Sequence, residues 1–152
     1  MQGTQAKRSP RARVFNSNKG WRVVGHRKIC FKSGWEVNFA IFLQFLKEKY
    51  QIQEWLYEPE TFWYNNIKRG VRSYKPDFKI IRNDGSHYWA EVKGYMDAKS
   101  NTKIKRFRKY YPEEELFIID KAWFIKQQQR LPRLCESWEN DYTEGMQECI
   151  GS

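Results

Sequence analysis

Three residues that can bind a metal ion or stabilise charge lie close together in the segment 73–94. Asp77 follows Pro76 at the start of one strand-like run, and Glu91 and Lys93 lie two positions apart in the next run. Charged side chains are rarely placed in strands that a core must cover unless they have a partner. These three side chains can act together only if the fold brings them to one face of a sheet.

The turn between the two runs decides whether they meet. Side chains alternate along a strand, so Glu91 and Lys93 share a face. A two-residue turn at 84–85 would send Asp77 to the other face. A three-residue turn over 83–85, with its glycine left-handed in a bulge, would place Asp77 opposite Glu91. The sequence allows both turns. We predict the three-residue turn, because Asn-Asp-Gly suits that bulge and because this turn lets the two acids act together at one site.

Two carboxylates that face each other across a hairpin need a positive partner. Their Cβ atoms would lie about 5 Å apart, and at about 4 Å and an effective dielectric near 20 the repulsion is on the order of 4 kcal/mol. Lys93 supplies one positive charge, and a divalent cation supplies two. Because the ligands are oxygens and no Cys or His converges on them, the sequence predicts Mg²⁺ or Mn²⁺ and not zinc.

Glu36 is a candidate third carboxylate. It stands three residues after Ser33 in "SGWEVNFAIFLQFLKEKY", so it can simply satisfy the first amides of a helix in a capping box. It also lies one and two turns before Ala40 and Leu43, on the stripe that faces the core. An inward carboxylate needs a partner, and a bound metal would serve.

The elements that must hold these residues follow a mixed pattern. The helix after Ser33 is followed by three strands rich in aromatic and β-branched residues, by a second helix over 102–111, and by the buried strand "ELFIID". This order predicts an α/β (α+β) domain with a mixed sheet, in which the crossover helix makes the last strand pair parallel. "KAWFIK" extends that strand or begins another short element. The first helix is apolar on more than one side, so the domain or a second subunit must cover several of its faces.

The charge of the chain is unevenly distributed. The 152 residues include 28 Lys and Arg against 18 Asp and Glu, a net charge of +10 that attracts polyanions such as nucleic acid. Residues 1–32 hold nine bases and no acid and are predicted to form a flexible basic arm. Residues 33–126 are the predicted folded domain, and residues 127–152 an acidic tail. No apolar run approaches a membrane span and no signal peptide is recognised, so we expect a soluble cytoplasmic protein.

The sequence resembles the PD-(D/E)XK nuclease superfamily. The motif is Pro76-Asp77 followed by Glu91-Val92-Lys93, with the helical acid Glu36 upstream. The surrounding segments "SGWEVNFA", "WLYEPETFWY", "IKRGVRSYKPDF" and "EVKGYMD" are similar to phage-encoded proteins of the endonuclease I-like group, whose better-known members resolve Holliday junctions. The resemblance covers about residues 33–126 and assigns no role to the arm or the tail.

The resemblance implies a restriction-endonuclease-like αβββαβ core and a metal-dependent phosphodiesterase that leaves 5′-phosphate and 3′-hydroxyl ends on DNA. It implies that Asp77 and Glu91 hold Mg²⁺ and that Glu36 adds a direct or water-mediated ligand. The Val92 carbonyl is a further ligand in this scheme. Lys93 orients the attacking water or stabilises charge on the phosphorane, in agreement with the chemistry of a metal and a nearby ammonium at a phosphoryl group.

Basic side chains flank these residues in the sequence. Runs of charge are usually solvated faces, but near a nuclease site they would clamp a phosphate backbone. The candidates for DNA binding lie around Gly70, on the second helix and in the arm: Lys68, Arg69, Arg72, Lys103, Lys105, Arg106, Lys109, Arg11 and Arg13. We expect capping or turn roles for Asp97 and Asp120 and a surface strand position for His87.

A four-way junction has two-fold symmetry and needs paired cuts, so the expected active form is a homodimer, with the first helix as a candidate interface. Two alternatives remain open. One is a nuclease of the same fold that acts on duplex or mismatched DNA, and the other is a non-catalytic DNA-binding module.

Overall fold

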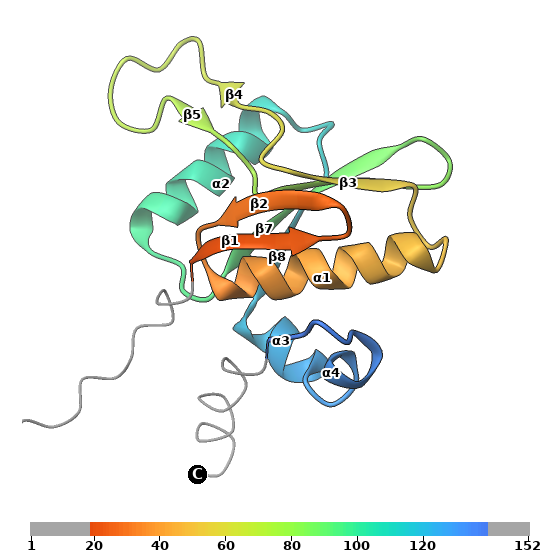
Figure 1. The fold of residues 1–152 in the computed structure, drawn as a ribbon. Coiled ribbons are helices and arrows are strands. Elements are labelled where there is room, and N and C mark those ends of the chain that lie inside the picture. The colour runs from red at the N-terminus through yellow and green to blue at the C-terminus, as the bar shows by residue number, and fades with distance from the viewer. Residues whose placement is uncertain (1–18, 140–152) are drawn as a thin grey trace, which may run out of the picture.

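A four-stranded sheet in the order β3-β6-β7-β8 forms the centre of the molecule (Figure 1). The computed structural model describes residues 19–139. Strands β3 (Glu54–Tyr57), β6 (Phe78–Ile81) and β7 (His87–Lys93) are antiparallel neighbours, and β8 (Leu116–Asp120) runs parallel to β7. Helix α2 (Ala98–Tyr110) makes the crossover that a parallel pair requires. The predicted mixed α/β class is confirmed.

The turn between β6 and β7 has three residues, as predicted. The Arg82 N–H donates to the Ser86 carbonyl at 2.8 Å, and Gly85 has a φ of +86°, a conformation that glycine adopts without strain. The strand register that follows from this turn places Asp77, one residue before β6, opposite Glu91. The sequence Asn-Asp-Gly therefore fixes which face of the sheet both acids occupy.

Helix α1 (Gly34–Glu48) is covered on several sides by its own chain. The Ser33 Oγ caps it by accepting the Glu36 N–H at 3.2 Å. The hairpin of β1 (Gly20–Val24) and β2 (Arg27–Phe31) and the helices α3 (Lys121–Gln127) and α4 (Leu131–Leu134) contribute residues to the same core cluster as α1 and the sheet. The apolar excess of α1 is thus explained within one subunit.

Two predicted boundaries are wrong. The arm was predicted to extend to residue 32, but Val24 and Phe31 are buried in the core. The tail was predicted to begin at residue 127, but Leu131 and Trp138 are buried in the same core cluster. In both segments a few apolar side chains among the charged ones pack into the core, so net charge was a poor guide to the boundary. The remaining parts of the arm and tail predictions, 1–18 with Arg11 and Arg13 and 140–152, lie outside the described residues.

The helical boundaries follow their caps. Helix α2 begins four residues earlier than predicted, because the Asp97 carboxylate accepts the Ser100 N–H at 2.7 Å. "KAWFIK" forms α3, capped by Asp120, which accepts the Trp123 N–H at 3.0 Å. The capping roles expected for the two aspartates are confirmed. In the part of the chain between residues 19 and 139, no helix is both long and apolar enough to cross a membrane.

A small two-stranded ribbon projects from the body beside α2 (Figure 1). It consists of β4 (Phe62–Trp63), β5 (Ser73–Tyr74) and the residues between them. We call residues 61–75 the lobe. Its inward side chains, which include Tyr64 and Tyr74, belong to a second core cluster with residues of α2 and β7. The lobe was not expected from the sequence, which predicted three strands between the two helices and no separate ribbon.

Candidate metal centre and nucleic-acid surface

Asp77 and Glu91 form a buried carboxylate pair at one end of the β6–β7 hairpin. Their exposed fractions are 7% and 6%. The Oδ2 of Asp77 accepts the Val92 N–H at 2.8 Å, and the Oε2 of Glu91 accepts the Tyr74 hydroxyl at 2.8 Å. One oxygen of each carboxylate is therefore fixed by a hydrogen bond from the protein. The structure brings together the two acids of the sequence motif.

The environment of this pair disfavours negative charge. Burial raises the pKa of Asp77 well above its ordinary value, and the negative charges of Glu91 and Glu36 raise it further. Burial also raises the pKa of Glu91, although the Tyr74 hydroxyl and the positive charges of Lys93 and Lys103 act in the opposite direction. The centre is thus short of positive charge, which is the condition that a bound cation relieves.

Glu36 lies near the pair but has its own partners. It is buried, and its Oε2 accepts the Tyr57 hydroxyl at 2.6 Å and the Lys32 N–H at 3.1 Å. Burial raises the pKa of Glu36 as well. Ser33 caps the helix as the sequence suggested, yet the Glu36 carboxylate accepts the amide of the residue before the cap and not that of Ser33. The side chain points inward, as its place on the helix predicted.

Glu58 is a fourth acid that sequence reasoning missed. Its N–H donates to the Asp77 carbonyl at 2.8 Å, and its carboxylate forms ion pairs with Lys32 and with Lys75, the latter at 3.7 Å. Its φ of +45° is unusual for a residue with a side chain and stores strain. Its negative charge adds to the raised pKa of both Asp77 and Glu36. Only the pairing of β3 with β6 could have identified it.

The side chains at this centre supply only part of the ligands of a hard divalent cation. Among residues 19–139, no group of three or more His, Cys, Asp or Glu side chains could hold a metal ion alone. Mg²⁺ needs fewer, because it is usually held by one or two carboxylates together with water and substrate phosphates. Asp77 and Glu91, with the Val92 carbonyl as a further oxygen, match that requirement. Tyr57 and the Lys32 amide occupy the Oε2 of Glu36, so a direct or water-mediated contact with a cation would use its other oxygen.

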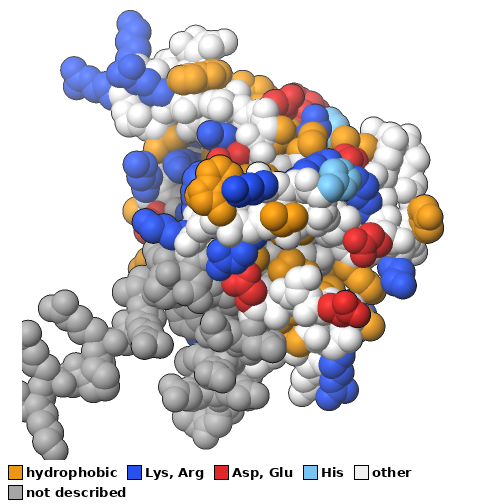
Figure 2. All heavy atoms as spheres, in the orientation of Figure 1, with side chains coloured by type: hydrophobic (Ala, Val, Ile, Leu, Met, Phe, Trp, Pro, Cys, Tyr) orange, Lys and Arg blue, Asp and Glu red, His pale blue; other side chains and the backbone are white. Residues whose placement is uncertain are grey.

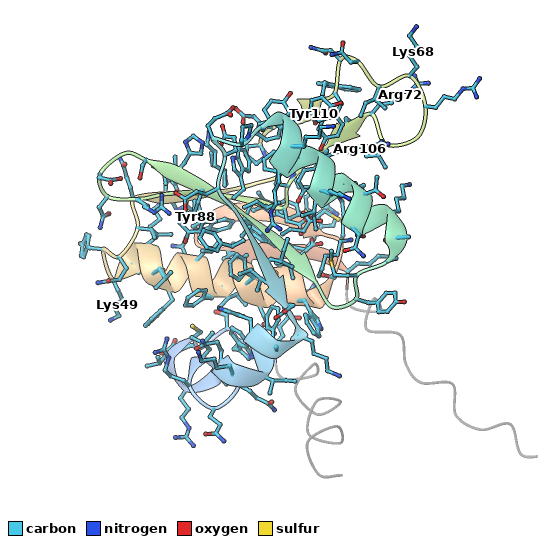
Figure 3. All side chains as sticks on the ribbon, turned by 180° about the vertical axis from the view of Figure 1, so that it is seen from behind. Lys49, Lys68, Arg72, Tyr88, Arg106 and Tyr110 are labelled. Carbon is cyan, nitrogen blue, oxygen red and sulfur yellow. The ribbon has the colours of Figure 1, made fainter. Side chains whose placement is uncertain are left out.

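The lobe and α2 form a surface without acids. The lobe contains four Lys and Arg and α2 contains six, and neither contains Asp or Glu. Figure 2 shows Lys and Arg side chains at the end of the lobe. In Figure 3, Lys68 extends from the lobe away from the body, and Arg72 lies on the lobe. The predicted DNA-binding residues that are exposed are Lys68, Arg69, Arg72, Lys105 and Lys109, whereas Lys103 and Arg106 are half-buried.

Arg106 differs from the other predicted DNA-binding residues because it holds the lobe in place. Its Nη1 donates to the Val71 carbonyl at 2.6 Å, and Figure 3 shows it between α2 and the lobe. Two tyrosine hydroxyls complete the attachment: Tyr111 donates to the Trp63 carbonyl at 2.7 Å and Tyr64 to the Lys103 carbonyl at 3.2 Å. The lobe and α2 therefore present their basic side chains as one unit.

Comparison with models of known protein families and with curated proteins gives no match for this chain.

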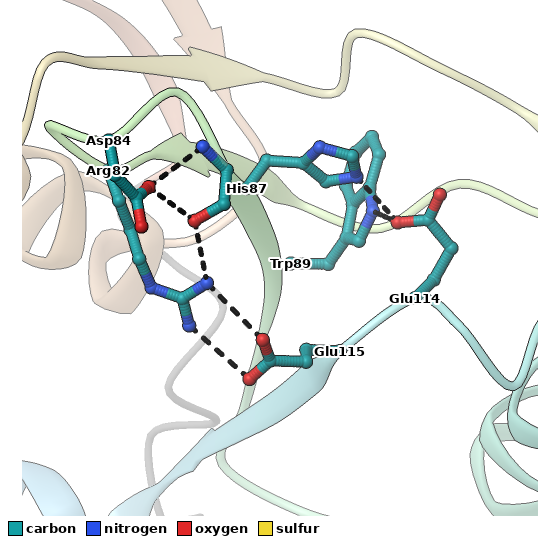
Figure 4. Close-up of polar contacts among 7 residues, drawn as sticks. Arg82, Asp84, His87, Trp89, Glu114 and Glu115 are labelled. Carbon is teal, nitrogen blue, oxygen red and sulfur yellow. Dashed lines mark hydrogen bonds and ion pairs between the residues drawn. The ribbon is translucent and has the colours of Figure 1, made fainter.

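His87 belongs to a separate polar cluster (Figure 4). Its Nε2 lies 2.7 Å from the Oε2 of Glu114, which also accepts the Trp89 indole N–H at 2.7 Å. Nearby, Arg82 forms an ion pair with Glu115 at 3.2 Å. These contacts tie β7 and the hairpin turn to the segment before β8. They give His87 a structural role, in line with the strand position expected for it.

A groove of about 540 Å³ lies between β2 and β3. It is lined by Arg27, Lys28, Ile29, Leu56, Tyr57 and Pro59. The groove reaches Tyr57, the partner of Glu36, but contains neither Asp77 nor Glu91. Its volume therefore does not describe the carboxylate centre.

Proposed function

We propose that the protein is a metal-dependent DNA endonuclease that hydrolyses phosphodiesters to 5′-phosphate and 3′-hydroxyl ends. The observation that carries the proposal is the burial of Asp77 directly opposite Glu91, with raised pKa values in both carboxylates. Burying two facing acids is costly to a fold unless a cation joins them. A third acid, Glu36 on helix α1, and the nearby Lys93 match the resemblance to PD-(D/E)XK nucleases.

In this proposal each residue has a distinct task. Asp77 and Glu91 would hold Mg²⁺ or Mn²⁺, with the Val92 carbonyl as a further oxygen ligand. The cation, when bound, polarises a phosphoryl oxygen and lowers the pKa of its water. The Lys93 ammonium orients the attacking water or offsets the charge that develops on the phosphate. Glu36, fixed by Tyr57, would add a direct or water-mediated ligand.

The acid-free surface of the lobe and α2 would bind the phosphate backbone. Lys103 supports this arrangement, because it lies on α2 and its charge also acts on Glu91. The same helix thus connects the proposed DNA surface to the proposed cutting site. Contacts of this kind set affinity and salt dependence, and they carry little sequence information.

The resemblance favours branched DNA, such as a four-way junction, as the substrate, and the two-fold symmetry of a junction favours a homodimer. Helix α1 is not the surface that we propose for that dimer, because its apolar sides are covered within the chain. The proposed compartment is the cytoplasm, which for a phage-encoded protein is that of the host cell. A nuclease acting on duplex or mismatched DNA, or a binding module without catalysis, remains the alternative.

The test is a cleavage assay with the full chain on a four-way junction and on a linear duplex of matched sequence. We expect cleavage in Mg²⁺ or Mn²⁺, none in Ca²⁺, and faster cutting of the junction. Nicks that DNA ligase reseals directly would establish the expected end chemistry. Equal cutting of both substrates favours the duplex alternative. Tight binding without cleavage in either metal would identify a non-catalytic module and refute the nuclease.

A further inference from the structure

The Tyr74 hydroxyl is held against the Glu91 carboxylate by a rigid environment. Tyr74 is 2% exposed, and its ring packs edge-on against Phe107 with centroids 5.2 Å apart and planes at 73°. Trp89 and Ile104 belong to the same core cluster. The ring cannot turn away without disturbing that cluster, so its hydroxyl stays 2.8 Å from the Oε2 of Glu91.

The chemistry of a buried phenol suits this position. Burial raises the pKa of Tyr74 far above its ordinary value, and the charge of Glu91 raises it further. The phenol is the donor and the carboxylate the acceptor in this contact. Groups that donate to a metal-binding carboxylate orient it, and their loss commonly weakens metal affinity by about 10- to 100-fold.

We propose that Tyr74 is a positioning residue of the cation centre: its hydroxyl fixes Glu91 in the orientation in which the carboxylate binds the divalent ion. This inference rests on the proposed function, because it takes Glu91 to be a metal ligand. It adds a residue outside the sequence motif, contributed by the strand β5 of the lobe. Tyr74 precedes Asp77 by three residues, so one short segment both orients one acid and carries the other.

The chain offers a matched control in Tyr64. It is also 2% exposed and belongs to the same core cluster, but its hydroxyl donates to the Lys103 carbonyl and not to a carboxylate. Tyr74→Phe and Tyr64→Phe therefore remove the same atom from equally buried rings. Only the first removal changes a contact of the cation centre.

The experiment is a titration of the full-length variants with Mn²⁺ alone, without DNA, followed by calorimetry or by the Mn²⁺ paramagnetic signal. We expect Tyr74→Phe to raise the Kd for Mn²⁺ by about 10-fold or more and Tyr64→Phe to leave it unchanged. In cleavage, Tyr74→Phe should shift the metal concentration for half-maximal rate by the same factor, while the rate at saturating Mn²⁺ approaches that of the unaltered protein. The rise in Tm caused by Mn²⁺ gives a second readout, which still applies if Tyr74→Phe lowers stability.

Unchanged Mn²⁺ affinity in Tyr74→Phe, or an equal loss in Tyr64→Phe, would overturn the role of Tyr74 and leave the proposed nuclease intact. An unaltered protein that binds Mn²⁺ but cuts no DNA would refute the nuclease, and the binding comparison would still decide the role of Tyr74. An unaltered protein that binds no Mn²⁺ at millimolar concentration would overturn both the metal centre and this inference.

Discussion

The Oδ2 of Asp77 accepts the backbone N–H of Val92 at 2.8 Å across the β6–β7 hairpin. This bond fixes Asp77 beside the residue that follows Glu91, so the sheet itself sets the spacing of the two acids. An amide oxygen can accept the same N–H. Asn at position 77 therefore removes the charge and keeps the geometry.

This relationship predicts the effect of Asp77→Asn on stability. Because the pKa of Asp77 is raised in the folded protein, its contribution to stability is full below the unfolded carboxyl pKa, about 4, and is lost as pH rises through the folded pKa. Without divalent cations, the Tm of the unaltered protein should fall between pH 5 and pH 8. Asp77→Asn should raise Tm at pH 8, by about 2–4 °C for each kcal/mol gained, and flatten the fall.

Circular dichroism at several pH values, with and without Mn²⁺, measures this effect. Asp84→Asn is the control, because Asp84 lies in the exposed hairpin turn and should give no such change. A lower Tm for Asp77→Asn at pH 8 would show that the buried charge is already compensated by the protein.

Lys93→Met should abolish cleavage and preserve DNA binding. It removes the cation beside Glu91 without a large change in volume, and we expect cutting to fall by at least about 10²–10³-fold. Glu91→Gln should have a similar effect on cutting. Gel-shift binding in Ca²⁺ separates catalysis from affinity. Lys126→Met, an exposed position on α3, should cut normally. Normal cutting by Lys93→Met would remove that residue from the mechanism.

Replacing Lys68, Arg69 and Arg72 with Ala should weaken DNA binding and flatten its salt dependence. If all three contact phosphates, the slope of log K against log salt falls in magnitude by about 2 to 3. The matched control replaces Lys49, Lys126 and Arg133, which are exposed and lie away from the lobe. Equal slopes in the two triple variants would mean that the lobe contacts no DNA.

Deleting residues 1–18 should weaken DNA binding and leave the fold intact. This segment contains four Lys and Arg and no acid, so up to about four phosphate contacts can be lost. Deleting residues 1–32 should instead unfold the protein, because it removes Val24 and Phe31 from the core. Thermal unfolding and salt-dependent binding of both truncations make the comparison. An unchanged salt slope in the shorter truncation would make this segment a passive tail.

Trp138→Ala should destabilise the domain by about 3–5 kcal/mol. Trp138 is 7% exposed and packs near Phe124, with ring centroids 6.5 Å apart. Leu134→Ala is the control, because Leu134 is 46% exposed and should cost little. Urea unfolding at fixed pH gives both values. Similar stabilities of the two variants would mean that the segment after residue 127 contributes little to the stability of the fold.

Local chemistry explains which features could be predicted from the sequence. The Asn-Asp-Gly turn and strand alternation favoured the register that places Asp77 opposite Glu91 without excluding the other register, and Ser33 was enough to begin α1. Tyr74 and Glu58 were missed because their roles depend on strand pairing and packing between distant segments, which leave no local pattern. The β1–β2 hairpin was missed because its apolar residues lie among many positive charges and two of them, Trp21 and Val23, are exposed.

The attachment of the lobe divides it into a replaceable part and a fixed part. Residues 68–70 are exposed at the outer end, whereas Val71 accepts the Arg106 hydrogen bond and Tyr74 donates to the Glu91 carboxylate. The outer loop could be exchanged for one of different length or charge to change how the proposed surface binds DNA. A graft extended through Val71 would loosen the lobe, and one extended through Tyr74 would alter the chemistry as well, so residue 70 is the natural limit for such engineering.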